Sequence, residues 1–146
     1  MEYDAGATAW VLMSSALVLF MTPGLALFYG GMTRSKNILN MLMMNVYCMG
    51  IIPVLWVVLG FTLVFGASGD AGWIGDFEFF GAKDLYTALP GDLGGNGFFG
   101  AFTIPLVVFI IFQLTFAVIT PALISGAVAD RMKFAAWAVF IPLWAL

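Results

Sequence analysis

The sequence predicts an all-α membrane protein built as a bundle of transmembrane helices. Its composition is 63% hydrophobic and only 9% charged, whereas soluble domains carry about 25% charged residues. Several apolar runs reach the roughly 20 residues that cross a bilayer core. Most of the basic residues lie in two short segments between these runs, and most of the acidic residues lie elsewhere. Together these observations favour one helical membrane domain.

The first predicted helix covers residues 7–29, which contain no charged residue. Trp10 near one end and Tyr29 at the other are typical of anchors at the membrane interface. Pro23 and Gly24 interrupt the run, because proline removes a backbone donor and kinks a helix. Such a break in a membrane helix is either a tolerated kink or a functional opening, and the residues alone do not decide between them.

A basic turn over residues 30–37 precedes the second predicted helix, residues 38–65. That run of 28 residues is longer than a bilayer needs, so the helix should tilt or protrude. Asn45 lies inside it, and its amide is expected to form an interhelical hydrogen bond. A direct role of Asn45 in binding a ligand is the alternative.

A long loop is predicted over residues 66–97, rich in glycine and acidic residues and containing a single base, Lys83. Its aromatic residues predict that the loop lies on the membrane surface. The acidic residues form a solvated surface or, alternatively, collect cations. The segment GDLGGNG resembles a phosphate-binding loop only superficially, because it lacks the flanking strand and its carboxylates would repel phosphate.

The third predicted helix covers residues 98–125. A stripe of large apolar side chains recurs along it at helical spacing, which places them on one face; the stripe consists of Phe109, Phe112, Phe116 and Ile119. Such a stripe either packs in a bundle or lines a path. Further along, Ala122 and Gly126 form a small-xxx-small pair, which lets another helix approach closely.

A second basic turn follows over residues 129–133, where Asp130 is expected to pair with a nearby base. Residues 134–146 begin a fourth apolar run. Its thirteen residues are too few to cross a bilayer at about 1.5 Å per residue. The sequence is therefore interpreted as part of a longer protein.

The positive-inside rule sets the expected orientation. The two turns hold four of the five basic residues, which are Arg34, Lys36, Arg131 and Lys133. This distribution places both turns in the cytoplasm, and the N-terminus and the long loop outside the cell.

The residue types argue against an enzyme. The chain has no histidine and one cysteine, and its helices contain no acid/base pair, nucleophile constellation or metal-ligand cluster. Neither a catalytic residue nor a cofactor, a metal site or a nucleic-acid partner is therefore predicted.

Three long segments resemble the ammonium transporters of the Amt family, in the wider Amt/Rh/MEP superfamily. They are ALVLFMTPGLALFYGGMTRSKNILNMLMMN at residues 16–45, LWVVLGFTLVFG at 55–66 and FQLTFAVITPALISGAVADRMKF at 112–134. The matches are ordered and correctly spaced, and they cover most of the chain.

The resemblance implies an eleven-helix channel or transporter with two inverted five-helix repeats, of which this chain holds about the first three and a half helices. It also implies homotrimers with one pore per subunit, nitrogen uptake at the cell (plasma) membrane, contact with membrane lipid, and a PII-type regulatory protein on the cytoplasmic face. Ammonium would meet an aromatic gate, lose a proton and continue through a hydrophobic pore. An ammonium sensor coupled to a signalling partner and an inactive truncated product are the alternatives.

The resemblance also assigns expected roles to individual residues. Phe116 matches a gate phenylalanine, and Phe112 and Gln113 match its neighbours on the vestibule side. The positions that match pore-lining residues are Leu25, Phe28, Tyr29 and Leu123. The family's paired histidines, recruiting tryptophan, structural aspartate and second gate phenylalanine fall beyond residue 146.

Overall fold

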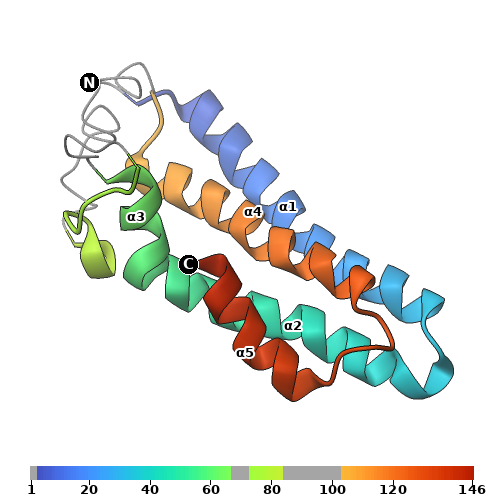
Figure 1. Cartoon of the computed structure of the whole chain (residues 1–146). Helices are drawn as coiled ribbons and strands as arrows, with labels where there is room; N and C mark the ends of the chain where they lie inside the picture. The colour runs from blue at the N-terminus through green and yellow to red at the C-terminus, as the bar shows by residue number, and fades with distance from the viewer. Residues whose placement is uncertain (1–2, 67–72, 84–102) are drawn as a thin grey trace. The chain divides into compact units, whose positions relative to one another are not determined.

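The computed structural model describes residues 3–66, 73–83 and 103–146, and the regular structure in these ranges is helical (Figure 1). The elements are α1 (Ala5–Met32), η1 (Ser35–Asn37), α2 (Ile38–Leu55), η2 (Trp56–Gly60), α3 (Phe61–Phe65), η3 (Phe80–Ala82), α4 (Leu106–Ala127) and α5 (Phe134–Ala145). Three stretches are long and apolar enough to cross a membrane: Ala5–Met32, Ser35–Phe65 and Leu106–Ala127. The prediction of an all-α membrane bundle is therefore confirmed.

The chain divides into two compact units, and two helices, α1 and α4, contribute to both. The first unit comprises the described parts of Met1–Ser15 and Trp56–Gln113. The second comprises Ala16–Leu55 and Leu114–Leu146.

Helix α1 begins where Asp4 caps it, because the carboxylate accepts the backbone N–H groups of Gly6 and Ala7 at 2.8 and 3.3 Å. The helix continues through Pro23 without a break in its assignment. The structure thus favours the tolerated proline over a functional opening at this position.

The end of α1 differs from the prediction. Residues 30–32 were expected to belong to the basic turn, but they are helical, and the helix ends at Met32. Thr33 closes the last turn, since its N–H bonds to the Tyr29 carbonyl and its hydroxyl donates to the Gly30 carbonyl at 3.0 Å. The turn proper is therefore shorter than the predicted 30–37.

The second apolar run forms three consecutive helical segments, α2, η2 and α3, over the predicted residues 38–65. Segment η2 is a π-helix, and it begins three residues after Pro53. Proline cannot donate a helical hydrogen bond, and π-helical turns are a common local adjustment within helices.

Part of the predicted external loop packs against α3 in the first unit. The Thr62 hydroxyl donates to the Asp76 carbonyl at 2.7 Å and accepts the Phe79 N–H at 3.1 Å. Phe79 is buried, whereas Trp73 is 91% exposed and Phe77 is 65% exposed. The loop's aromatic residues thus differ in burial, and its predicted position on the membrane surface stays a prediction. The GDLGGNG segment and Asp70, Asp84 and Asp92 lie outside the described residues.

Helix α4 begins at Leu106, whereas the sequence predicted a helix from residue 98. Residues 98–102 lie outside the described residues, and residues 103–105 are not helical. Pro105 stands directly before the helix, where its missing N–H costs no helical hydrogen bond. Its carbonyl accepts the N–H groups of Val108 and Phe109 at 3.0 and 3.3 Å.

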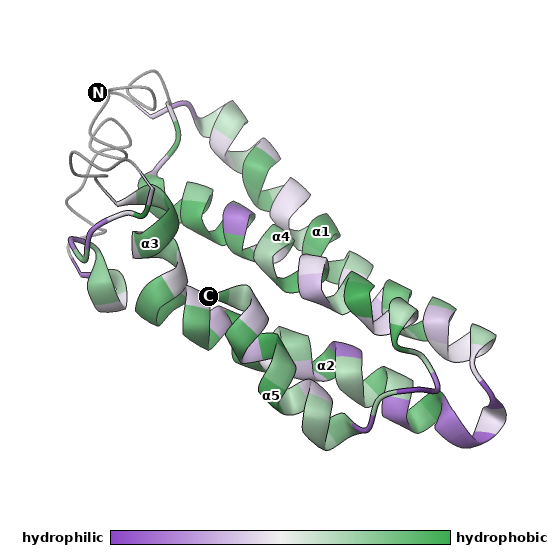
Figure 2. Cartoon of the chain, in the orientation of Figure 1, coloured by the Kyte–Doolittle hydropathy of each residue, from purple (hydrophilic) through white to green (hydrophobic). Residues whose placement is uncertain are grey.

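The core of the second unit joins α2, α4 and α5. Its fully buried apolar side chains are Met44, Cys48, Ile52, Val118, Ala122, Trp137 and Ile141. Side-chain donors also link α2 to α5: Trp137 Nε1 donates to the Met44 carbonyl at 3.0 Å, and the Tyr47 hydroxyl donates to the Ala138 carbonyl at 2.9 Å. Apolar residues dominate these helices, and hydrophilic residues concentrate at the connecting turns (Figure 2).

Candidate functional site

In the second unit, α4 has one buried face and one face that this chain leaves uncovered. Val118, Ala122 and Ser125 are 0% exposed. On the other side, Phe116 is 42% exposed and Leu123 is 49% exposed, and Thr120 between them is also exposed. Residues three and four apart share a helix face, so Phe116, Thr120 and Leu123 form a continuous stripe, called here the α4 stripe.

A polar pair fixes the opposite face of α4 against α2. Asn45 is 0% exposed, and its amide donates to the Ser125 hydroxyl at 3.1 Å and to the Met41 carbonyl at 2.9 Å. The predicted interhelical hydrogen bond of Asn45 is confirmed. Because the amide is engaged in packing the helices, the alternative of a ligand-binding role receives no support.

Helix α1 approaches α4 at the small residues that the sequence singled out. A Cβ atom placed on Gly126 would lie 2.7 Å from Tyr29 Cζ, which is too close for any other residue without movement. The Tyr29 hydroxyl also lies 3.4 Å from the Leu123 carbonyl. The predicted close approach is therefore confirmed at Gly126, where the neighbour is the Tyr29 ring, whereas Ala122 is buried in the core of α2, α4 and α5.

The residues predicted to line a pore occupy different environments in the second unit. Phe28 is 62% exposed and forms a tilted ring pair with Tyr29 at 5.8 Å between centroids. Leu25 is half-buried and packs against the core of the unit. The structure thus brings Tyr29 and Leu123 together and leaves the Phe28 ring uncovered.

Phe112 and Gln113 belong to the first unit, where both are half-buried. The same unit contains an aromatic cluster in which Phe65 meets Phe109 edge-on at 5.2 Å.

Two features of the second unit were not predicted. Thr22 is 0% exposed, and its hydroxyl has no hydrogen-bond partner among the described residues. The carboxylate of Asp130 accepts a hydrogen bond from the Asn37 amide, whereas a basic partner was expected. No sequence signal marks either feature, because both depend on which helices meet.

The chemistry of the α4 stripe is apolar and aromatic with one hydroxyl. The Thr120 hydroxyl donates to the Phe116 carbonyl at 2.7 Å, so the stripe carries no charged group and its polar group is already engaged. Within the described ranges, no cluster of histidine, cysteine or acidic residues could hold a metal ion. The stripe is suited to contact apolar surfaces or a small species that passes along them.

These features define the chain as a multi-pass helical membrane protein, with a buried interhelical polar pair and an uncovered apolar stripe. A model of the Ammonium Transporter Family matches residues 9–146. The chain belongs to this family.

Curated relatives agree with this assignment. The chain is 50% identical to an ammonium transporter of Mycobacterium tuberculosis strain H37Rv, over 97% of this chain and 31% of the relative. It is 44% identical to an ammonium transporter of Bacillus subtilis strain 168, over 96% of this chain and 32% of the relative. The chain thus spans about a third of the length of these relatives.

Solved structures show the same fold. The chain matches Saccharomyces cerevisiae Mep2 with a TM-score of 0.81 and 29% identity, covering 99% of this chain and 31% of that one. It matches a mutant of Candida albicans Mep2 with a TM-score of 0.79 and 28% identity, covering 99% and 30%.

Proposed function

We propose that the complete protein transports ammonium or ammonia across the membrane through a hydrophobic pore, and that the α4 stripe lines part of that pore. The observation that carries the proposal is the uncovered stripe Phe116–Thr120–Leu123 on a membrane helix of an Ammonium Transporter Family chain. Relatives at 44% and 50% identity that are named ammonium transporters support the substrate.

Phe116 is proposed as the gate. A bare ammonium ion in hydrocarbon costs at least several kcal/mol, and an aromatic face returns about 0.5–2 kcal/mol of attraction, depending on desolvation. One ring therefore cannot replace the hydration shell of an ion. It can, however, favour a small cation at the entrance and block the path by its bulk, which suits a gate that precedes deprotonation.

The remaining assignments follow the resemblance to the family. Phe28, Tyr29, Leu25 and Leu123 are proposed to line the pore, and Phe112 with Gln113 to face the outer vestibule. Phe28 is 62% exposed and Leu123 is 49% exposed, which supports the proposal that these two side chains line the pore. Leu25 is half-buried, so only the exposed part of its side chain would face the pore.

The assembly is part of the same proposal. The complete protein is proposed to have eleven helices and to form homotrimers in the plasma membrane, with a PII-type regulatory protein on its cytoplasmic face. The N-terminus would lie outside and the basic turns inside, as the positive-inside rule indicates.

Substitution of Phe116 in the full-length protein tests the transport proposal. Phe116→Ala removes both bulk and ring, whereas Phe116→Leu keeps much of the bulk and loses the quadrupole. Uptake of labelled methylammonium and ammonium-dependent current are measured for both variants. We expect Phe116→Ala to change transport strongly, by loss or by leak.

The comparison between the two variants identifies the mechanism. If Phe116→Leu behaves like the parent, the residue acts as a steric plug; if it fails like alanine, the ring's electrostatics matter. Phe80→Ala is the control, because Phe80 is a 50% exposed aromatic ring in the predicted external loop. Unchanged rate, selectivity and ammonium affinity in both Phe116 variants would show that Phe116 only packs.

A further inference from the structure

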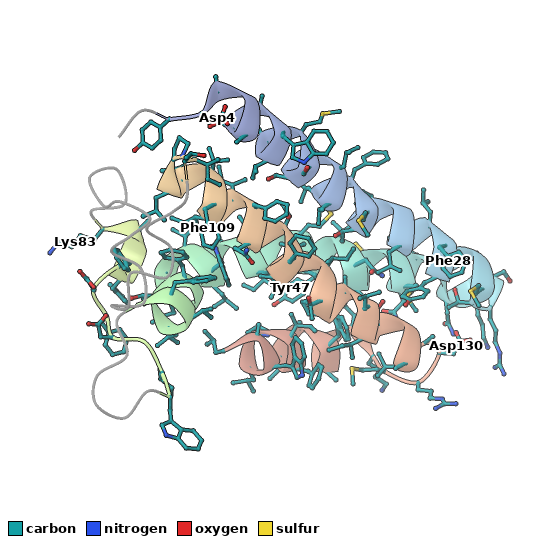
Figure 3. All side chains as sticks on the ribbon, turned by 90° about the horizontal axis from the view of Figure 1, so that it is seen from above. Asp4, Phe28, Tyr47, Lys83, Phe109 and Asp130 are labelled. Atoms are coloured by element: carbon teal, nitrogen blue, oxygen red, sulfur yellow. The ribbon has the colours of Figure 1, made fainter. Side chains whose placement is uncertain are left out.

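The two basic turns of the second unit are joined into one surface. The Asn37 amide donates to Asp130 Oδ1, and the Asn40 amide donates to the Met132 carbonyl at 3.4 Å. Asp130 has a φ of 60°, a left-handed conformation that aspartate tolerates better than most residues. These contacts fix the segment between α4 and α5 against the start of α2, at the end of the unit marked by Asp130 in Figure 3.

A polar cavity of about 420 Å³ lies at this junction. Its lining consists of Asn37, Asn40, Asp130, Arg131, Met132, Lys133 and Phe134. Arg131 and Lys133 bring two positive charges and Asp130 brings one negative charge, so the lining keeps a net positive charge, and the Asp130 carboxylate accepts the Asn37 amide. The donors suited to a phosphate group are therefore Arg131 and Lys133, since the Asn37 and Asn40 amides already donate to Asp130 and to the Met132 carbonyl.

The start of α5 adds to this electrostatic bias. Lys133 is the N-cap of α5, and its side chain forms no capping hydrogen bond. The first N–H groups of a helix and its dipole attract negative charge. The residues at this helix start, Lys133 and Phe134, both line the polar cavity.

An apolar groove adjoins the polar cavity. The groove has a volume of about 550 Å³, and it shares Arg131, Met132 and Lys133 with the polar cavity. The rest of its lining is aliphatic: Ala127, Val128 and Ala136. A cationic polar cavity that continues into an aliphatic groove matches a molecule with an anionic head and a hydrocarbon tail.

We propose that this pair of cavities binds one anionic phospholipid, with its phosphate between Arg131 and Lys133 and part of an acyl chain along Ala127, Val128 and Ala136. Basic pockets between transmembrane helices are a known form of lipid-headgroup site. Free phosphate shares the headgroup chemistry, but it would leave the adjoining aliphatic groove unused. The site is independent of the transport proposal, because it requires only that the protein lies in a bilayer.

Native mass spectrometry of the delipidated full-length protein tests the site. Binding of phosphatidylglycerol and of phosphatidylcholine is measured for the parent and for the variant Arg131→Gln/Lys133→Gln. The parent should prefer phosphatidylglycerol. The double variant should bind it about 10- to 30-fold more weakly, since each base near the surface contributes a severalfold effect.

A matched control separates the site from general surface charge. Arg34→Gln/Lys36→Gln removes the same charge from the adjoining turn, and neither residue lines either cavity. It should leave phosphatidylglycerol binding within about twofold of the parent. Equal loss in the two double variants, with unchanged melting temperatures, overturns the proposal in favour of diffuse surface charge.

Two further measurements distinguish a lipid from a free anion. Ala136→Leu narrows the aliphatic groove and should weaken phosphatidylglycerol binding while keeping the preference over phosphatidylcholine. Millimolar inorganic phosphate should fail to displace the lipid. Displacement by phosphate, or an Ala136→Leu variant that binds like the parent, would overturn the assignment to a phospholipid.

Discussion

The contact between Tyr47 and Ala138 makes a specific prediction about stability. Pro142 lies inside α5 and has no N–H to give to the carbonyl four residues earlier, which is that of Ala138. The Tyr47 hydroxyl of α2 donates to this carbonyl at 2.9 Å. A backbone carbonyl without a partner is costly in a bilayer, because no water is present to pair with it. Tyr47 therefore supplies the donor that the proline removes.

The substitution Tyr47→Phe removes only that donor. The ring remains, and with it the edge-on contact with Phe134, whose centroid lies 5.6 Å away. Leaving the carbonyl unpaired should lower the free energy of unfolding by about 1–2 kcal/mol, the range in which the general cost of a lost partner and the measured values for membrane helices overlap.

Pro142→Ala provides the decisive comparison, because alanine restores a helical N–H to the Ala138 carbonyl. In a Pro142→Ala background, Tyr47→Phe should therefore cost only a few tenths of a kcal/mol, which gives a coupling of about 1 kcal/mol in the double-mutant cycle. Stability is measured by denaturation of the full-length protein in mixed micelles. The reasoning is wrong if Tyr47→Phe costs the same with and without the proline.

Tyr29→Phe is the matched control for the same chemistry. The Tyr29 hydroxyl lies 3.4 Å from the Leu123 carbonyl, which is long for a bond from a hydroxyl donor. Residue 127, four positions later, is an alanine within α4, so the helix can supply its own donor. We expect this substitution to change stability by no more than a few tenths of a kcal/mol.

The remaining predictions test packing, topology and completeness. Asn45→Ala should lower unfolding stability by about 0.6–1.7 kcal/mol; no change would contradict a structural role. Gly126→Leu should lower the melting temperature, since its side chain would meet the Tyr29 ring, 2.7 Å from the Cβ position; an unchanged value refutes the close approach. Cysteines at Ser35 and Trp73 should react with an impermeant thiol reagent from opposite sides, Trp73 from outside; labelling of both in intact cells contradicts the orientation. Residues 1–146 alone should show no saturable methylammonium uptake, and robust uptake would refute a need for further helices.

The membrane spans could be predicted from the sequence because burial in lipid imposes a length and a composition on each segment. Helix starts were harder to predict where the loop is as apolar as the helix. The residues before Leu106 include Phe102 and Ile104, so hydropathy continues across the boundary, and only Pro105 marks it. At the end of α1, Gly30 and Gly31 suggested a turn, yet the helix extends through both residues to Met32.

The hydrogen-bond partners between helices could not be predicted from the sequence. Asn45 could be expected to bond to another helix, but its partner Ser125 lies 80 residues away and resembles other hydroxyl residues in the same helix. The donor to the Ala138 carbonyl could not be predicted either. Pro142 indicates that a helical hydrogen bond is missing, but the sequence does not indicate that Tyr47 replaces it. Thr22 shows the converse case, a buried hydroxyl that the described residues leave without a partner.

The distribution of polar groups in the second unit explains how an apolar path can be held in place by polar contacts. Three polar side chains of this core, Asn45, Tyr47 and Trp137, donate hydrogen bonds to neighbouring helices. None of these contacts involves a side chain of the α4 stripe. If the α4 stripe lines a pore, as proposed above, further polar groups on it would bind a passing cation and slow its release. Their placement between helices instead fixes the position of α4 and leaves the stripe apolar and aromatic apart from the engaged Thr120 hydroxyl.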